Sequence, residues 1–356
     1  MKFVHIADVH LGATPDSDKP WADLRQREIW DSFKNIIEVC NREKADLLLI
    51  AGDLFHRQPL LRELKEVNYC FSKLETARVV LMAGNHDYIG PRSHYAGFNW
   101  DEKVYMFLND TIESVYFSDI DTFVYGFSYL KRDITDPLYD SVQPAKGDSI
   151  NILIAHGGDE KNIPINRKRL LNAGFDYIAL GHIHKPEIIS ENMAYAGSLE
   201  PLDKNETGPR GYILGEIKKN GKKQTEIRFI KSSLREYKKF DITVSSQTTN
   251  GALVDLIKEK ISEEGQQHIY QILIKGLRDE NIRFDKDAIY SLGNILEVTD
   301  ESVPDYDFDA LYLENADNLI GMFIKEIKES NQEETARKAL YYGIEALLGA
   351  RDTDGI

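Results

Sequence analysis

The sequence is poor in the features that mark secreted and membrane-spanning proteins. Only two cysteines, Cys40 and Cys70, occur in 356 residues, and both lie in apolar, helix-like surroundings. This argues against a disulfide framework and favours a reducing compartment. No apolar run approaches the length of a membrane span, and Lys2 leads directly into a strand-like segment instead of a signal peptide. We therefore expect a cytoplasmic protein with no membrane segment.

Basic residues are also scarce. Lys and Arg number 44 against 59 Asp and Glu, which gives a net charge of −15. This balance argues against a surface that coats nucleic acid generally, but it leaves room for a local basic track. Residues 301–356 hold 13 acidic and 5 basic residues, so more than half of the excess negative charge lies there.

What the chain does contain is typical of a soluble protein of two or three domains, with 42% hydrophobic and 29% charged residues. Apolar strands alternate with helices over the first 180 residues, which predicts an α/β sheet. The expected strands are 2–7, 46–51, 79–82, 112–118, 121–127, 151–155 and 176–180, and the expected helices are 23–40, 60–77 and 93–108. Antiparallel strands are expected over 187–232, a small α+β unit over 239–299, and two helices over 315–329 and 333–349.

Polar side chains follow five of the apolar strands at the point where each strand ends. The carboxyl ends of strands in such sheets gather ligands at one edge, so these side chains can converge although they are far apart in sequence. Taken singly, each is ordinary turn or helix-entry chemistry, whereas five in succession predict a site. The converging set is Asp8, His10, Asp53, Asn85, His86, His156, His182 and His184.

The chemistry of this set indicates divalent metal ions. Carboxylate, amide and imidazole ligands without thiolates favour Mn²⁺, Zn²⁺ or Fe²⁺ over a structural zinc site. Seven ligands are too many for one ion and suit two ions that share a carboxylate. Two ions about 3.5–4 Å apart can hold a phosphoryl group, activate a water and stabilise the leaving oxygen. Phosphate ester hydrolysis is the reaction that such a pair suits best.

The motif order resembles the calcineurin-like metallophosphoesterase superfamily. That order is Asp-x-His, Gly-Asp, Gly-Asn-His-Asp, His-Gly and Gly-His-x-His. The flanks 6–12, 51–56 and 196–198 resemble its DNA-repair nuclease branch, the SbcD or meiotic-recombination-eleven type of nuclease subunit. The resemblance implies a four-layer α/β/β/α sandwich over 1–235, a small α+β capping domain over 236–300, and a C-terminal helical segment over 301–356.

The resemblance also implies a role for each residue of the set. One ion would be held by Asp8, His10, Asp53 and His184, and the other by Asp53, Asn85, His156 and His182. His86 would face the leaving oxygen as a proton donor, and His56 would steer the scissile phosphate. Manganese is the first choice of metal, with iron or zinc as alternatives. Asp87 either orients a histidine or caps the next helix.

The function implied is that of a metal-dependent DNA exonuclease or endonuclease subunit that works in DNA repair with an SMC-like ATPase. Two alternatives stay open. One is a small-molecule phosphomonoesterase or cyclic-nucleotide phosphodiesterase on the same core, and the other is a docking or regulatory subunit with a vestigial metal site. The histidines set aside as ligands are His5, His94 and His268, because none closes a strand beside another ligand type.

Three surfaces are expected to serve partners. DNA phosphates would meet a local basic track, which would make binding salt-dependent without sequence preference. The track consists of Arg57, Arg92, Lys161, Arg167, Lys168 and Arg169, of which 167–169 also suit an ordinary solvated helix start. A homodimer would use Leu64, Val67, Phe71 and Leu74, which equally suit core. The ATPase would bind the tail stripes Leu319, Ile320, Phe323, Ile324 and Ile327 and Ala336, Leu340, Ile344 and Leu347.

Overall fold

The computed structural model describes residues 1–145, 147–328 and 333–353. The chain divides into two compact units, of which the first is Met1–Tyr237 and the second begins at Lys238. No helix of the described part is long and apolar enough to cross a membrane.

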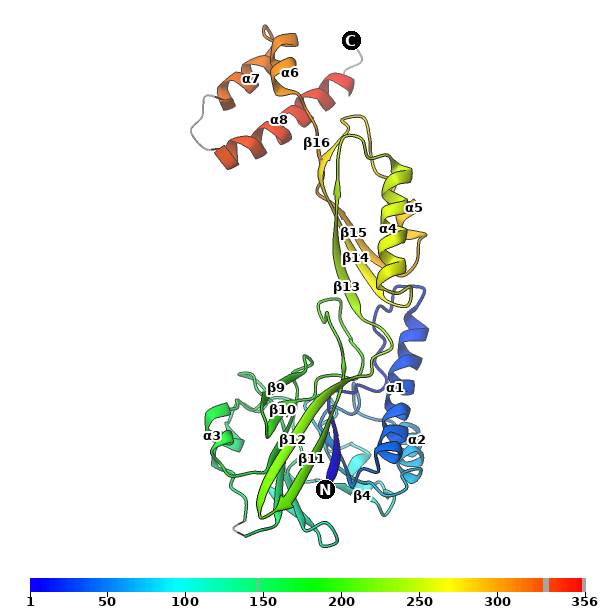
Figure 1. The fold of residues 1–356 in the computed structure, drawn as a ribbon, viewed down its shortest axis with the longest axis vertical. Coiled ribbons are helices and arrows are strands. Elements are labelled where there is room, and N and C mark those ends of the chain that lie inside the picture. Colours follow the sequence, from blue (N-terminus) through cyan, green and yellow to red (C-terminus); the bar gives the residue numbers. More distant parts are fainter. Residues whose placement is uncertain (146, 329–332, 354–356) are drawn as a thin grey trace. The chain divides into compact units, whose positions relative to one another are not determined.

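The first unit contains a six-stranded sheet in the order β12-β11-β1-β2-β3-β4 (Figure 1). Its strands are β1 (Lys2–Ile6), β2 (Leu47–Ala51), β3 (Arg78–Met82), β4 (Val104–Met106), β11 (Gly211–Asn220) and β12 (Lys222–Lys231). The four strands from β1 to β4 are parallel neighbours, while β11 runs antiparallel to β1 and forms a hairpin with β12. The carboxyl ends of β1, β2 and β3 therefore lie side by side.

A second six-stranded sheet follows the order β5-β6-β7-β8-β10-β9. Its strands are β5 (Glu113–Phe117), β6 (Thr122–Gly126), β7 (Ile150–His156), β8 (Tyr177–Gly181), β9 (Glu187–Ser190) and β10 (Met193–Tyr195). The strands β6, β7, β8 and β10 are parallel, and β5 and β9 are antiparallel edges. Because β7 and β8 are neighbours, their carboxyl ends also share one edge.

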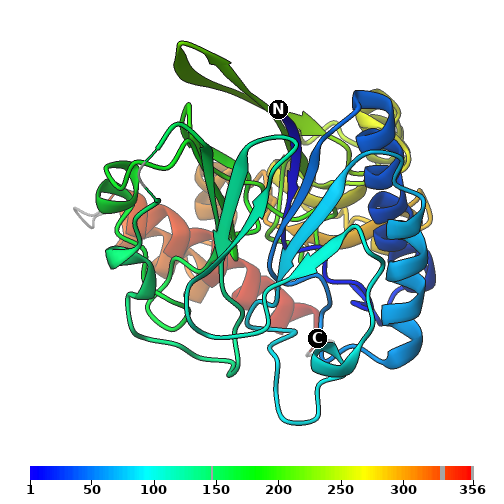
Figure 2. The ribbon, with the colours of Figure 1, turned by 90° about the horizontal axis from the view of Figure 1, so that it is seen from below.

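The two sheets stack face to face with helices outside (Figure 2). Alternate residues of each strand face opposite sides, so Leu47 and Leu49 join a core between the sheets while Leu48 and Ile50 face the helices α1 (Ala22–Glu43) and α2 (Leu61–Ser72). Only the short helix α3 (Arg167–Leu171) and the 3₁₀ turn η2 (Leu138–Ser141) cover the second sheet. The expected α/β sandwich is confirmed, with a thin fourth layer.

The second unit holds a smaller sheet and three tail helices. The sheet has the order β13-β14-β15, with β16 paired to β14. Its elements are β13 (Tyr237–Val244), α4 (Asn250–Glu264), β14 (Ile269–Arg278), α5 (Lys286–Tyr290), β15 (Ile295–Asp300) and β16 (Val303–Pro304). The tail helices are α6 (Phe308–Glu314), α7 (Leu319–Lys328) and α8 (Glu333–Thr353). The sheet is thus as the sequence predicts, whereas α6 is an additional helix that begins at the N-cap Asp307.

The helix expected over 93–108 is wrong. The segment contains only the 3₁₀ turn η1 (Tyr95–Gly97) and then β4, which pairs with β3. Its aromatic residues pack onto the helix side of the first sheet, where the ring of Trp100 lies 5.9 Å from that of Phe71. Tertiary packing and strand pairing therefore override the local helical pattern.

The two apolar patterns considered for partners both lie largely within the protein. Leu64, Val67, Phe71 and Leu74 are buried in the core beneath α1 and α2, so they are core and offer no dimer surface. The inward faces of α6, α7 and α8 form a small core of their own around Ile320, Ile324, Leu340 and Ile344. The stripes of the tail helices are thus satisfied by one another.

Candidate metal centre

The polar residues expected to converge lie in the loops that follow five parallel strands. Three of these strands are neighbours in the first sheet and two are neighbours in the second, so the loops meet at one edge of the sandwich. In chain order the residues are Asp8 and His10 after β1, Asp53 after β2, Asn85 and His86 after β3, His156 at the end of β7, and His182 and His184 after β8.

The backbone at this edge adopts a conformation that side chains other than glycine rarely take. A positive φ costs on the order of 1–3 kcal/mol and persists only where the surrounding structure enforces it. Four of the proposed ligands have it: Asp8 (50°), His10 (53°), Asp53 (50°) and His182 (91°). Hydrogen bonds between loops hold two of them, from the His10 amide to the Asp53 carbonyl at 3.1 Å and from the Asp8 amide to the Gly52 carbonyl at 3.2 Å.

Gly84 explains why the loop after β3 begins with a small residue. A Cβ at this position would lie 2.2 Å from Asp53 Oδ1 and 2.8 Å from His156 Nε2. Any side chain would therefore displace a carboxylate and an imidazole of the set. The glycine lets two loops from different sheets approach each other closely.

Three residues of the first proposed ligand group come within bonding reach of one ion. Asp8, His10 and His184 each offer an atom within 4.8 Å of those of the other two. His10 Nε2 lies 3.0 Å from His184 Nε2 and 3.8 Å from Asp53 Oδ2. The fourth proposed ligand, Asp53, is thus on the side of His10 that faces the second group.

The second proposed group surrounds Asn85. Its Oδ1 lies 2.9 Å from His156 Nε2 and 3.1 Å from His182 Nδ1. His156 Nε2 is also 3.4 Å from Asp53 Oδ2. Asp53 therefore stands between the two groups, as a shared carboxylate would.

The hydrogen-bonding roles of these atoms call for a cation among them. The His156 Nδ1–H donates to the Ala51 carbonyl at 2.9 Å, so in the neutral ring Nε2 carries a lone pair. That lone pair faces the oxygens of Asn85 and Asp53, which are also acceptors. Burial lowers the pKa of His156, but the nearby carboxylates of Asp53 and Asp8 outweigh it and raise the pKa to about 9. A proton can thus occupy the place that a metal ion would take, and the residues fit divalent ions.

Asp53 is held in its charged form although it is buried. Burial raises the pKa of its carboxyl group, but His156 and His10 more than offset this and hold the pKa well below the usual range. Asp8 shows the opposite balance, since burial outweighs the neighbouring imidazoles and raises its pKa. Both oxygens of Asp8 accept the backbone N–H of His182 at 3.0 Å. The ionised carboxylate is therefore the one between the two groups.

His86 lies beside the two groups and outside both. Its ring is 4.7 Å from that of His10 and stacks on that of His56 at 5.2 Å. The Nδ1–H donates to the His56 carbonyl at 3.1 Å, and the backbone N–H donates to Asp53 Oδ1 at 2.9 Å. The His86 side chain thus reaches no donor of either group through a hydrogen bond.

His56 is exposed and lies against both His86 and a proposed ligand. Its Nδ1 is 3.3 Å from the Nδ1 of His10. Burial and the neighbouring His86 lower the pKa of His56, which favours a neutral ring that can accept the N–H of His10. No pattern in the sequence indicates this contact with His10.

Asp87 neither orients a histidine nor caps a helix. Its buried carboxylate accepts hydrogen bonds from the Gly84 amide at 2.8 Å, the Phe55 amide at 3.1 Å and the Tyr95 hydroxyl at 2.8 Å. Burial and the charge of Asp53 raise its pKa to about 7. Asp87 therefore fastens the loop after β2 to the loop after β3.

Two carboxylates that the sequence-based prediction missed contact the outer histidines. Asp159 Oδ2 lies 2.7 Å from His182 Nε2, and Glu206 Oε1 lies 2.6 Å from His184 Nδ1. Asp159 comes three residues after His156, so its place beside a ligand was a usable signal. Glu206 lies in an irregular loop before β11, where no periodic pattern marks it.

The proposed basic track is partly neutralised by acidic neighbours. Arg57 pairs with Glu63 at 2.9 Å, Arg167 with Glu187 at 2.8 Å, and Arg169 with Asp140 at 3.0 Å. Within residues 1–145 and 147–328, the cations of the track that have no ion-pair partner are Arg92, Lys161 and Lys168. These three are the residues best placed to meet an external phosphate.

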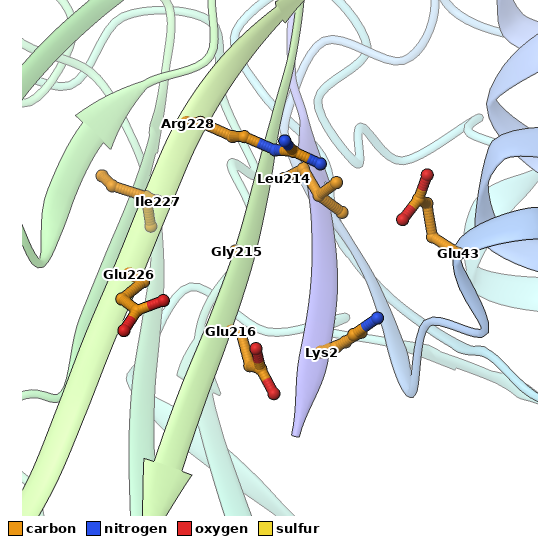
Figure 3. Close-up of a pocket in the computed structure, with 8 residues that line it drawn as sticks. All are labelled: Lys2, Glu43, Leu214, Gly215, Glu216, Glu226, Ile227 and Arg228. Carbon is orange, nitrogen blue, oxygen red and sulfur yellow. The ribbon is translucent and has the colours of Figure 1, made fainter.

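A pocket of about 360 Å³ lies away from this edge (Figure 3). Lys2 and Gly215 line it, together with charged side chains such as Glu43 and Arg228. Lys2 begins β1, whereas Asp8 follows its end, so the pocket is at the opposite end of the strand from the donors. None of the proposed metal ligands lines it.

Comparison with known proteins identifies the class. Residues 1–186 match the family described as calcineurin-like phosphoesterase, and the chain belongs to this family. The resemblance seen in the motifs is confirmed, and the family implies divalent metal ions and hydrolysis of phosphate esters.

Its relatives carry more particular names. A protein named "DNA double-strand break repair protein Mre11" from Methanocaldococcus jannaschii is 30% identical over 262 residues, which are 68% of this chain and 69% of the relative. The SbcD component of "Nuclease SbcCD" from Staphylococcus saprophyticus is 28% identical over 255 residues, covering 61% and 66%. "Uncharacterized metallophosphoesterase YhaO" from Bacillus subtilis is 27% identical over 305 residues, covering 79% and 73%.

Proposed function

We propose that the chain is a two-metal DNA nuclease subunit that acts in DNA repair together with an SMC-like ATPase. The observation that carries the proposal is the gathering of seven carboxylate, amide and imidazole donors at one edge of the sandwich, with His86 and His56 beside them. The names of the relatives from Methanocaldococcus and Staphylococcus support DNA as the substrate. A cytoplasmic location agrees with the two buried, unpaired cysteines.

The donors divide the binding of two ions between them. Asp8, His10 and His184 would hold one ion, Asn85, His156 and His182 would hold the other, and Asp53 would bind both. When bound, two such ions activate a water and neutralise charge on the phosphoryl oxygens and the leaving oxygen. Manganese suits this oxygen-rich and imidazole-rich set, with iron and zinc as alternatives.

His86 would act on the leaving group. Because its Nδ1–H is engaged by the His56 carbonyl, Nε2 is the nitrogen that can bring a proton to the leaving oxygen. His56 would contribute in two ways, by holding His10 through Nδ1 and by offering Nε2 to the scissile phosphate. Neither role requires these residues to bind a metal ion.

The two alternatives predict different behaviour. A docking subunit with a vestigial site has no need of donors whose lone pairs converge, and here all seven proposed ligands are present. A small-molecule phosphoesterase would use the same donors and needs no extended groove or basic track. Arg92, Lys161 and Lys168 and the sheet-and-helix part of the second unit favour DNA, and we propose that part as the capping domain.

A metal titration separates these functions. We expect purified protein with Mn²⁺ to shorten or cut linear duplex DNA and to hydrolyse bis-p-nitrophenyl phosphate, with both activities abolished by a chelator. Hydrolysis of p-nitrophenyl phosphate or a cyclic nucleotide without any cleavage of DNA would favour the small-molecule enzyme. A protein that binds Mn²⁺ but hydrolyses none of these substrates would favour the docking subunit.

The tail helices are proposed to bind the coiled-coil base of the ATPase through their outer side. Leu313, Leu319, Met322 and Tyr342 remain exposed although the inner faces of α6, α7 and α8 are packed. We expect removal of residues 301–356 to abolish co-purification with the ATPase and to leave hydrolysis of bis-p-nitrophenyl phosphate unchanged.

A point variant makes this test sharper. Leu319→Asp with Met322→Asp alters exposed positions only, so it should keep the fold and lose the ATPase. The matched control, Lys325→Asp, changes a polar residue of the same helix and should keep it. Capture that survives both the deletion and the double variant would remove the tail from the interface. A homodimer remains a prediction, to be checked by light scattering at micromolar concentration.

A further inference from the structure

His182 and His184 are separated by one residue, yet they turn opposite nitrogens toward the metal centre. His182 points Nε2 at Asp159 (2.7 Å) and Nδ1 at Asn85 Oδ1 (3.1 Å). His184 points Nδ1 at Glu206 (2.6 Å) and Nε2 at His10 Nε2 (3.0 Å). Each ring therefore has one nitrogen on a carboxylate and the other among the proposed ligands.

The carboxylates decide which nitrogen of each ring is bare. An ionised carboxylate can only accept hydrogen bonds, so the ring nitrogen beside it carries the N–H. In a neutral imidazole the other nitrogen then has the lone pair that binds metal. Asp159 thus selects Nδ1 of His182, and Glu206 selects Nε2 of His184.

We propose that Asp159 and Glu206 are positioning residues, each of which controls the affinity for one of the two ions. Glu206 acts through His184 on the ion shared with His10, and Asp159 acts through His182 on the ion shared with Asn85. The proposal rests on the two-metal function above and deepens it. Partners of this kind fix the tautomer and orientation of a metal-binding histidine and increase its basicity.

Both carboxylates are themselves held in place. Glu206 Oε2 accepts the Leu202 amide at 2.9 Å, and the side chain is 18% exposed. Asp159 Oδ1 accepts the amides of Lys161 and Asn162, both at 2.8 Å, and the side chain is 48% exposed. Because Glu206 is better shielded from water, its interaction with the imidazole is screened less. We expect the larger effect from Glu206, and the stronger salt dependence from Asp159.

The test compares Glu206→Ala and Asp159→Ala with the matched control Glu187→Ala. Glu187 lies three residues after His184 and pairs with Arg167, so its loss changes the charge of the chain equally without touching a proposed ligand. Mn²⁺ binding to the metal-free protein is measured by calorimetry. We expect one of the two binding steps to weaken by about 10–100-fold in each variant and neither in the control.

Anomalous diffraction at limiting Mn²⁺ then assigns the weakened ion. In Glu206→Ala the occupancy should fall beside His10 and His184, and in Asp159→Ala it should fall beside Asn85 and His182. Glu206→Gln, which retains an oxygen acceptor, should recover part of the affinity. A merely structural role would weaken both ions together and would lower the denaturation midpoint of the metal-free protein.

The outcomes separate this inference from the proposed function. Wild-type protein that binds no divalent ion would overturn both. Wild-type protein that binds two ions, with variants whose two affinities equal those of the control, would overturn the positioning roles and leave the nuclease proposal intact. Loss of the ion opposite to the one assigned would also overturn the inference.

Discussion

Asp53→Asn should leave a folded protein that holds neither metal ion firmly. Asp53 is the one side chain assigned to both ligand groups, with Oδ2 3.8 Å from His10 Nε2 and 3.4 Å from His156 Nε2. The amide has the same shape but no charge, and one of its two polar atoms becomes a donor that repels a cation. Loss of a supporting residue of a metal site costs about 10–100-fold in affinity, and loss of a shared ligand should cost more for each ion.

The measurement is Mn²⁺ content after dialysis, together with hydrolysis of duplex DNA and of bis-p-nitrophenyl phosphate. Both activities should fall by more than about 100-fold, because the activated ester needs the ions as much as DNA does. Asp119→Asn removes a carboxylate that pairs with Arg78 at the surface and should keep two ions per chain. An Asp53→Asn protein that keeps one tightly bound ion would show that Asp53 does not bridge.

The fold and the proposed ligands follow from the sequence for one physical reason. A buried parallel strand needs an unbroken apolar run, and 47–51 or 79–82 supply one with no polar interruption. The first polar residue after such a run must lie at the sheet edge. Asp53 and Asn85 are therefore placed by counting along the chain, and their convergence follows from strands being parallel and adjacent.

What the sequence leaves out depends on contacts between distant loops. Asp159 and Glu206 reach His182 and His184 from irregular segments whose course no periodicity fixes. Asp87 was ambiguous because its three hydrogen-bond donors come from two loops and an aromatic residue. The acidic partners of Arg57, Arg167 and Arg169 were equally invisible, since ion pairs formed by side chains of distant segments have no signature in spacing.

The same distinction separates His86 from its neighbours, and it gives the last prediction. His86→Ala should keep two ions per chain, because the side chain touches no donor of either group and the backbone N–H that bonds Asp53 is retained. Hydrolysis of duplex DNA should fall by about 10²–10⁴-fold, the typical contribution of general acid catalysis. On bis-p-nitrophenyl phosphate the loss should be much smaller, because nitrophenolate leaves without a proton.

Three quantities are measured on one preparation: metal content, the rate on DNA, and the rate on the activated ester. His94→Ala is the matched control, since His94 is an exposed histidine after the same strand that lies outside the donor groups, and it should leave all three unchanged. Two ions with equal losses on both substrates would mean that His86 stabilises the phosphoryl group and donates no proton. Loss of an ion would make His86 a ligand, and because His10 lies 4.7 Å from its ring, the ion lost should then be the one that His10 shares with His184.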